Sequence, residues 1–205
     1  MSFYNFAKGL VNGFIKLFFR VEFEGIENIP KDGAFVAVAN HRSLIDPIFI
    51  AVKSKRQFHF MAKSELFFFP FKYVMRGLGA FPVHRGHGDS GAVQTAEKIL
   101  SEGKILAMFP EGTRSKTGKP LPAKSGVARI AAHSKADVLP IGITFKGRLT
   151  PFKKVKVTYG KLIKNSEINF GDGKAHDLKK ASEFIMGKII DLVDLDVTLG
   201  VKQWK

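Results

Sequence analysis

A histidine and an aspartate five positions apart, His41 and Asp46, have the residue types and the spacing of a catalytic pair. An aspartate that accepts a hydrogen bond from one ring nitrogen of a histidine fixes its tautomer and leaves the other nitrogen free as a general base. This is part of a triad that lacks its own nucleophile. A second interpretation remains open, in which Asp46 only caps a helix that begins at Pro47 and His41 is an ordinary polar group at a strand end.

Residues 110–115 (PEGTRS) offer groups that suit a phosphorylated ligand. Arg114 can bind a phosphate through two parallel hydrogen bonds, and Glu111 can hold a hydroxyl group or orient that arginine. Gly112 allows the backbone to approach a ligand closely. Without the neighbouring segments, the same stretch would be more typical of a surface loop with a Glu–Arg pair.

Basic residues follow two other expected strands. Arg85 comes after residues 79–84, and Lys63 comes after residues 57–62. In open α/β sheets, ligands bind outside the carboxyl ends of the strands. We therefore expect both side chains to lie on the same rim of the sheet as His41, where Lys63 could join a phosphate site.

Strand-like and helix-like segments alternate along the chain, which predicts an α/β fold with a central, mostly parallel or mixed sheet flanked by helices. The run 33–39 (GAFVAVA) carries no charge and suits a strand buried on both faces, ending just before His41. The expected strands are residues 21–29 at an edge, 33–39, 57–62, 79–84, 104–109, 138–145 and 155–159. The expected helices are residues 1–20, 46–53, 70–76, about 90–103, 125–134 and 176–192.

The first twenty residues are expected to form an amphipathic helix, because apolar residues recur at helical spacing among Lys8, Lys16 and Arg20, with no acidic residue. The lysines interrupt this stretch too often for a membrane span. The pattern predicts a helix on the surface of an anionic membrane, with packing against the protein's own domain as the alternative. We therefore divide the chain into a membrane-surface helix, residues 1–20, and one α/β domain, residues 21–205.

The composition narrows the classes of partner. The 205 residues carry a net charge of +15, so nucleic acid, an anionic membrane or a phosphorylated ligand would fit. The 20 phenylalanines lie in apolar runs, such as residues 66–71, and are not interleaved with Lys and Arg as base-stacking platforms, which argues against nucleic acid. The absence of cysteine excludes a thiol nucleophile, and His84 and His87 have no evident third metal ligand.

Four ordered blocks of residues resemble those of the glycerolipid acyltransferase family, which includes the 1-acyl-glycerol-3-phosphate (lysophosphatidate) acyltransferases. The blocks are residues 40–46 (NHRSLID), 79–85 (GAFPVHR), 109–115 (FPEGTRS) and 138–141 (VLPI). The first and third are specific, and the order and spacing of all four support the resemblance.

The resemblance implies a glycerol-3-phosphate acyltransferase-like fold and direct acyl transfer from acyl-coenzyme A or acyl-acyl carrier protein, with no other cofactor and no metal. It assigns His41 as the base and Asp46 as the residue that orients it. The implied ligands of the acceptor are Lys63, Arg85, Glu111, Gly112, Thr113 and Arg114. An acyl thioester is already activated, so a base without a nucleophile is sufficient for this reaction.

The acceptor is expected to be lysophosphatidate and the product phosphatidate. His84 stands where an acid or an arginine often precedes the last arginine of the second block, so another lysophospholipid, glycerol 3-phosphate and lyso-ornithine lipid remain alternatives. A non-catalytic adaptor on an anionic membrane is an alternative of another class. We expect a peripheral, monotopic protein on the cytoplasmic face of a membrane, bound to anionic lipids.

Overall fold

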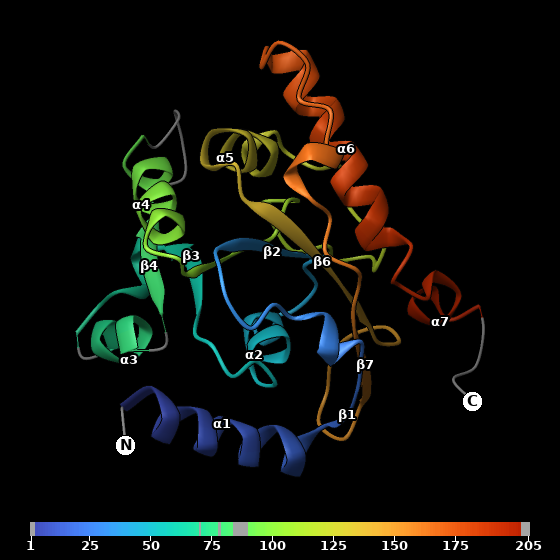
Figure 1. The fold of residues 1–205 in the computed structure, drawn as a ribbon. Coiled ribbons are helices and arrows are strands. Elements are labelled where there is room, and N and C mark those ends of the chain that lie inside the picture. The colour runs from blue at the N-terminus through green and yellow to red at the C-terminus, as the bar shows by residue number, and fades with distance from the viewer. Residues whose placement is uncertain (1–2, 70, 78, 84–89, 202–205) are drawn as a thin grey trace.

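A seven-stranded sheet forms the centre of the protein, in the strand order β1-β7-β6-β2-β5-β3-β4 (Figure 1). The computed structural model describes residues 3–69, 71–77, 79–83 and 90–201. Neighbouring strands are parallel, except that β6 and β7 are antiparallel, so the sheet is mixed as expected. The strands are β1 (Arg20–Glu24), β2 (Phe35–Ala39), β3 (Phe58–Lys63), β4 (Ala80–Val83), β5 (Ile105–Met108), β6 (Asp137–Thr144) and β7 (Lys154–Tyr159).

Helices cover both faces of this sheet, as Figure 1 shows. Helices α1 and α2 pack on one face, and α4, α5 and α6 pack on the other. Each face has its own hydrophobic cluster, and the sheet separates the two. The helices are α1 (Phe3–Phe18), α2 (Asp46–Ala51), α3 (Phe71–Gly77), α4 (Ser90–Ser101), α5 (Gly126–Ser134), α6 (Ala175–Ile190) and α7 (Leu195–Leu199).

Strand β2 lies at the centre of the sheet and is buried along its whole length. Side chains alternate between the faces of a strand, so Phe35 and Ala37 enter the cluster beneath α2 while Val36 and Val38 enter the cluster beneath α5 and α6. The prediction of a strand covered on both faces is confirmed. Its carboxyl end leads to His41 from the buried centre of the sheet.

The expected edge strand at residues 21–29 is wrong in its second half. Strand β1 does lie at the edge, but it ends at Glu24, because Gly25 takes a left-handed backbone with φ +68° and starts a short 3-10 helix, Ile26–Asn28. A Cβ atom on Gly25 would lie 2.1 Å from the carbonyl oxygen of Tyr159. Glycine is therefore required there, and the chain leaves the sheet at that residue.

Candidate functional site

Asn40 fixes the point where the chain leaves β2. Its Nδ2 donates to the carbonyl oxygen of Ile143 at 2.9 Å, and its Oδ1 accepts from the Ile143 N–H at 2.7 Å. The backbone pairing of β2 with β6 ends one residue earlier, at Ala39 and Ile141. The amide side chain thus continues the ladder in place of a peptide group. Asn40 is buried, so both bonds are shielded from water.

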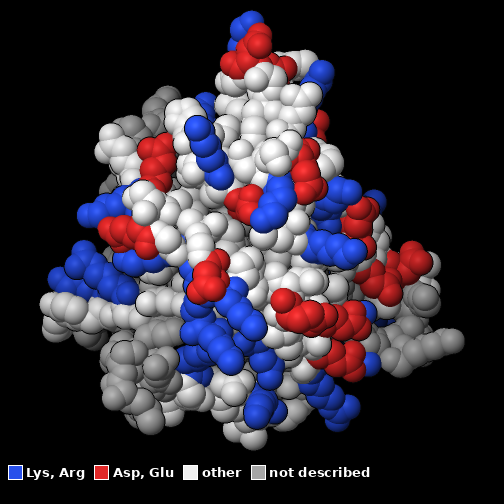
Figure 2. All heavy atoms as spheres, viewed as in Figure 1, with Lys and Arg blue, Asp and Glu red and all other residues white. Residues whose placement is uncertain are grey.

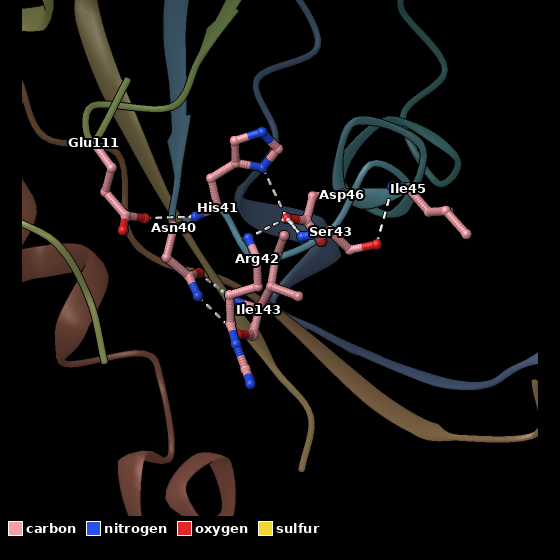
Figure 3. A network of polar contacts seen from close by, with 8 residues as sticks. All are labelled: Asn40, His41, Arg42, Ser43, Ile45, Asp46, Glu111 and Ile143. Carbon is pink, nitrogen blue, oxygen red and sulfur yellow. Dashed lines mark hydrogen bonds and ion pairs between the residues drawn. The ribbon is translucent and has the colours of Figure 1, made fainter. Parts of the chain in front are cut away.

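His41 and Asp46 form the predicted pair. The His41 Nδ1 lies 2.9 Å from Oδ2 of Asp46, and Figure 3 shows the other ring nitrogen pointing away from that carboxylate. The imidazole stacks on the Phe109 ring, with 4.0 Å between ring centroids and 18° between ring planes. With its rotation restricted by the carboxylate and the phenyl ring, the imidazole can present Nε2 as a positioned base.

Asp46 is held by more than the histidine. Its Oδ2 also accepts hydrogen bonds from the backbone N–H groups of Arg42 at 2.6 Å and Ser43 at 2.7 Å. The side chain is fully buried, and Oδ1 has no partner among the described residues. The chain between histidine and aspartate therefore folds around a single carboxylate oxygen, as the dashed lines in Figure 3 show.

The expectation that Asp46 caps the helix is wrong by one residue. Asp46 is the first residue of α2, with Pro47 in the first turn, and Ile45 occupies the N-cap position without a side-chain cap. The carboxylate turns back toward the preceding loop, where it has three donors, and it makes no cap bond to the helix. This arrangement excludes the interpretation of Asp46 as a helix cap alone.

Glu111 holds the backbone of His41. One carboxylate oxygen accepts from the His41 N–H at 2.6 Å and the other from the Leu121 N–H at 2.8 Å, while Ser115 N–H donates to the His41 carbonyl at 2.8 Å. Both polar backbone groups of His41 thus bond to residues 111–115. Glu111 is buried, and this burial raises the pKa of its carboxyl group above the ordinary value.

The other residues of the 110–115 segment are more open. Gly112 has φ +68°, and a Cβ atom there would lie 2.9 Å from the Cδ of Lys124. Thr113 and Arg114 are exposed, and Arg114 forms no ion pair with any described residue. Arg114 is therefore available to an anionic ligand. Lys124, which lies outside the four sequence blocks, adds a second cation beside Gly112.

Arg42 is a further residue that the sequence did not single out as a site residue. Its guanidinium donates to the carbonyl oxygens of Phe145 and, at 2.9 Å, of Gly147, and it lies 4.0 Å from the centroid of the Phe145 ring. Burial lowers the pKa of this guanidinium. Arg42 connects the segment after β2 to the segment after β6. No signal in the sequence indicates this contact, because the partners are 103 and 105 residues away.

Lys63 and Arg85 were expected on the same rim. Lys63 is the last residue of β3 and is paired in register with Val83, the last residue of the parallel strand β4. The carboxyl end of β3 therefore lies beside that of β4, from which the chain continues to Arg85. Arg85 and His84 fall outside the described residues, so the expected role of Arg85 stays a prediction. The roles assigned to Lys63, Gly112, Thr113 and Arg114 in ligand binding stay predictions too.

A family model described as Acyltransferase matches residues 20–144, more than half of the chain, and this range contains the histidine-aspartate pair and Glu111. The chain belongs to the acyltransferase family.

Relatives of this acyltransferase carry more specific names. This chain is 34% identical over 141 residues to the 1-acyl-sn-glycerol-3-phosphate acyltransferase of Bacillus subtilis, and the match covers 67% of this chain and 69% of that one. It is 32% identical over 178 residues to the protein of that name from Streptococcus pneumoniae, covering 81% of this chain and 64% of that one. The crystal structure of the 1-acyl-sn-glycerophosphate (LPA) acyltransferase from Thermotoga maritima matches with a TM-score of 0.71 and 29% identity, over 98% of this chain and 82% of that one.

Among the residues that the structure describes, no group of three or more His, Asp or Glu side chains could hold a metal ion. No helix in the described part of this acyltransferase is both long and apolar enough to cross a membrane.

Proposed function

We propose that this acyltransferase moves a fatty acyl group from an acyl thioester to the free hydroxyl of lysophosphatidate, giving phosphatidate. The observation that carries the proposal is the His41 imidazole, which is bonded to Asp46 through Nδ1 and leaves Nε2 available. The names of the relatives support the choice of acceptor and product. The thioester donor is acyl-coenzyme A or acyl-acyl carrier protein, used as a co-substrate.

The first step is the attack of the acceptor hydroxyl on the thioester carbonyl. Nε2 of His41 takes the hydroxyl proton as the new C–O bond forms, which produces a tetrahedral intermediate and an imidazolium. The buried carboxylate of Asp46 stabilises that imidazolium through the 2.9 Å contact at Nδ1. No covalent bond to the enzyme forms.

The second step is the collapse of the intermediate. The C–S bond breaks, the carbonyl re-forms, and the coenzyme A or carrier-protein thiolate leaves. The imidazolium returns its proton to the thiolate from Nε2, so His41 ends the cycle neutral. Because the thioester supplies the activated acyl group, this mechanism uses no metal and no further cofactor.

The acceptor phosphate binds to cations on the rim of the sheet. Arg114 is exposed without an ion pair among the described residues, Lys63 is the last residue of β3, and Arg85 comes after β4, whose carboxyl end lies on the same rim. Glu111 has both carboxylate oxygens bonded to backbone N–H groups, so we assign it to holding the histidine segment beside the bound acceptor. This departs from the expectation that Glu111 holds a hydroxyl group or orients Arg114.

The same chemistry favours a location at a membrane surface. Helix α1 packs on the core through Ile15 and leaves Leu10 and Leu17 more than 60% exposed. Phe68 and Phe69, which follow β3, are 59% and 75% exposed. We assign these side chains to the interface of an anionic bilayer, on the cytoplasmic face where thioester donors are available.

The test is acyl transfer by the purified protein to lysophosphatidate, glycerol 3-phosphate and lyso-ornithine lipid, each with acyl-coenzyme A and acyl-acyl carrier protein. We expect transfer to lysophosphatidate, with thiol release and phosphatidate formed in equal amounts. Transfer only to another acceptor would show that the assignment of lysophosphatidate as the acceptor is wrong. If no acceptor reacts while the protein binds anionic vesicles, the membrane-adaptor interpretation replaces the enzyme.

A further inference from the structure

The segment between β6 and β7, residues 145–153 (FKGRLTPFK), carries an aromatic side chain that the fold does not bury. Phe152 is 66% exposed, although a phenylalanine gains stability from burial. Its backbone is left-handed, with φ +62°. This conformation is strained for a bulky residue, and Asn or Gly adopts it more easily. Neither packing nor backbone preference therefore accounts for phenylalanine at this position.

Phe152 lies beside the end of helix α1. Its N–H donates to the carbonyl oxygen of Phe18 at 2.6 Å, and the Arg20 N–H donates to the carbonyl oxygen of Lys153 at 3.1 Å. The Phe18 and Phe152 ring centroids are 6.5 Å apart. Figure 1 shows the β6–β7 connection running down beside the end of α1. The segment and the helix therefore present one continuous surface.

This surface is apolar where it meets α1, and basic residues adjoin it along the chain. Helix α1 adds Phe14 and Leu17, which are 47% and 67% exposed. Figure 2 shows Lys and Arg side chains gathered over the lower part of the molecule, where Figure 1 draws α1 and α2. Three cations are close neighbours of these apolar residues along the chain, namely Lys16 on α1, Arg20 at the start of β1 and Lys153 directly after Phe152.

The nearby acids do not neutralise those cations. On β1, Glu22 and Glu24 form ion pairs with Lys154 at 3.0 Å and Lys156 at 2.9 Å. Within the described residues, Lys16, Arg20 and Lys153 form no ion pair. An apolar surface with unpaired cations around it suits an anionic bilayer, because aromatic rings enter the acyl boundary while the cations meet the headgroups.

We propose that residues 145–153 are a second bilayer-contacting element of this protein, with the Phe152 side chain inserted among anionic phospholipids beside α1. The inference rests on the proposed membrane location of α1 and adds Phe152 to the residues that contact lipid. The same segment is bonded to the site, because Arg42 donates to the carbonyl oxygens of Phe145 and Gly147. Lipid contact at Phe152 therefore holds the histidine segment at a fixed distance from the membrane that supplies the acceptor.

The first experiment uses a substitution with opposite expected effects on folding and on binding. Phe152→Asn removes the aromatic ring and relieves the left-handed backbone, so the melting temperature should stay the same or rise. Partition onto phosphatidylglycerol-containing vesicles should fall about five- to tenfold. Phe184→Asn is the matched control, since Phe184 is 42% exposed on α6, which packs on the other sheet face. Equal partition of the Phe152→Asn variant and the wild type would overturn the proposal.

The second experiment places a reporter at the residue. In a chain whose single tryptophan, Trp204, is replaced by phenylalanine, Phe152→Trp should give emission that shifts to the blue on vesicles and is quenched by brominated acyl chains. Phe184→Trp in the same background should change little. Quenching that is absent at position 152, or equal at both positions, would overturn the proposal.

The outcomes separate this inference from the proposed enzyme function. If the wild-type protein acylates detergent-dispersed lysophosphatidate but position 152 meets no lipid, the bilayer contact fails and the enzyme function stands. If position 152 inserts into vesicles while no acceptor is acylated, the enzyme function fails and the contact stands.

Discussion

The loop that follows β2 and the outer face of α1 are opposite in character. In the loop, one oxygen of the buried Asp46 carboxylate accepts three hydrogen bonds, and both polar backbone groups of His41 are bonded to residues 111–115. On α1, Leu10 and Leu17 lie mostly in solvent. In the loop, the His41 backbone and one oxygen of Asp46 are hydrogen-bonded within the chain, while the helix retains apolar surface that the described residues do not cover.

This difference separates two ways in which a structure prepares for function. Catalysis of acyl transfer depends on groups that are already in place before charge develops, and the His41 loop is held in that way. An exposed apolar surface gains free energy only when something covers it. Substitutions in the first region should therefore change the rate constant, and substitutions in the second should change where the protein is located.

The largest effect that tests this contrast is expected from Asp46→Asn. The asparagine oxygen can keep the bonds to Arg42 and Ser43, and its NH₂ group takes the place of the unpartnered Oδ1, so the fold is retained. The loss of charge removes the stabilisation of the imidazolium, and kcat should fall about 10²- to 10⁴-fold. The measurement is thiol release from acyl-coenzyme A at saturating acceptor. A kcat within tenfold of the wild-type value would show that Asp46 has only a structural role.

The next largest effect is a difference in folding stability between substitutions on the buried side and on the exposed side of α1. Ile15 is 2% exposed in the core and Leu17 is 67% exposed. Ile15→Ala should lower the free energy of unfolding by about 2–4 kcal/mol because it leaves a cavity. Leu17→Ala should change it by less than about 0.5 kcal/mol. Urea denaturation of both variants measures these changes. Equal losses of unfolding free energy would mean that the outer side of α1 is also packed in solution.

Membrane binding, unlike folding stability, should depend on the exposed side of α1. Leu17→Ser removes apolar surface from the face assigned to lipid, so partition onto anionic vesicles should weaken about three- to tenfold while the melting temperature is unchanged. Sedimentation with phosphatidylglycerol vesicles measures the partition, and phosphatidylcholine vesicles are the control for charge. Unchanged partition would remove α1 from the proposed membrane surface.

The smallest effect concerns the pH dependence of folding. Burial raises the pKa of Glu111 above its ordinary value of 4.5, so the folded state binds this proton more tightly than the unfolded chain does. The resulting stabilisation is complete below about pH 4.5 and is lost as the pH rises through the raised pKa. Relative to Glu111→Gln, the wild type should therefore lose free energy of unfolding between pH 4.5 and neutral pH. Urea denaturation across this range measures the difference, and an increase with pH would contradict the assignment.

The fold was largely predictable because the strands that matter are apolar runs. Residues 33–39 and 104–109 were expected as buried strands and appear as β2 and β5 with ends shifted by one or two residues. The error at residues 25–29 came from Gly25, which takes a left-handed backbone where a side chain would meet Tyr159, far along the chain. Helix α7, with five residues, is too short to show a periodic pattern.

The site was predictable only as far as local spacing reaches. The five-residue spacing of His41 and Asp46 and the motif around Glu111 indicated residues that the structure does bring together. The contacts of Asn40 with Ile143 and of Arg42 with Phe145 each span 103 residues and exist only because β2 lies beside β6. Such contacts follow from the sheet topology, which local sequence does not specify.

The most direct test of the central claim is the rate of acyl transfer to lysophosphatidate by the His41→Ala variant. A matched control is His133→Ala, since His133 is an exposed histidine that pairs with Glu97 away from the site. Circular dichroism should show both variants to be folded. We expect a kcat at least about 10³-fold below wild type for His41→Ala and a wild-type kcat for His133→Ala. A folded His41→Ala variant that retains the wild-type rate of acyl transfer would show that His41 is not the base of the reaction.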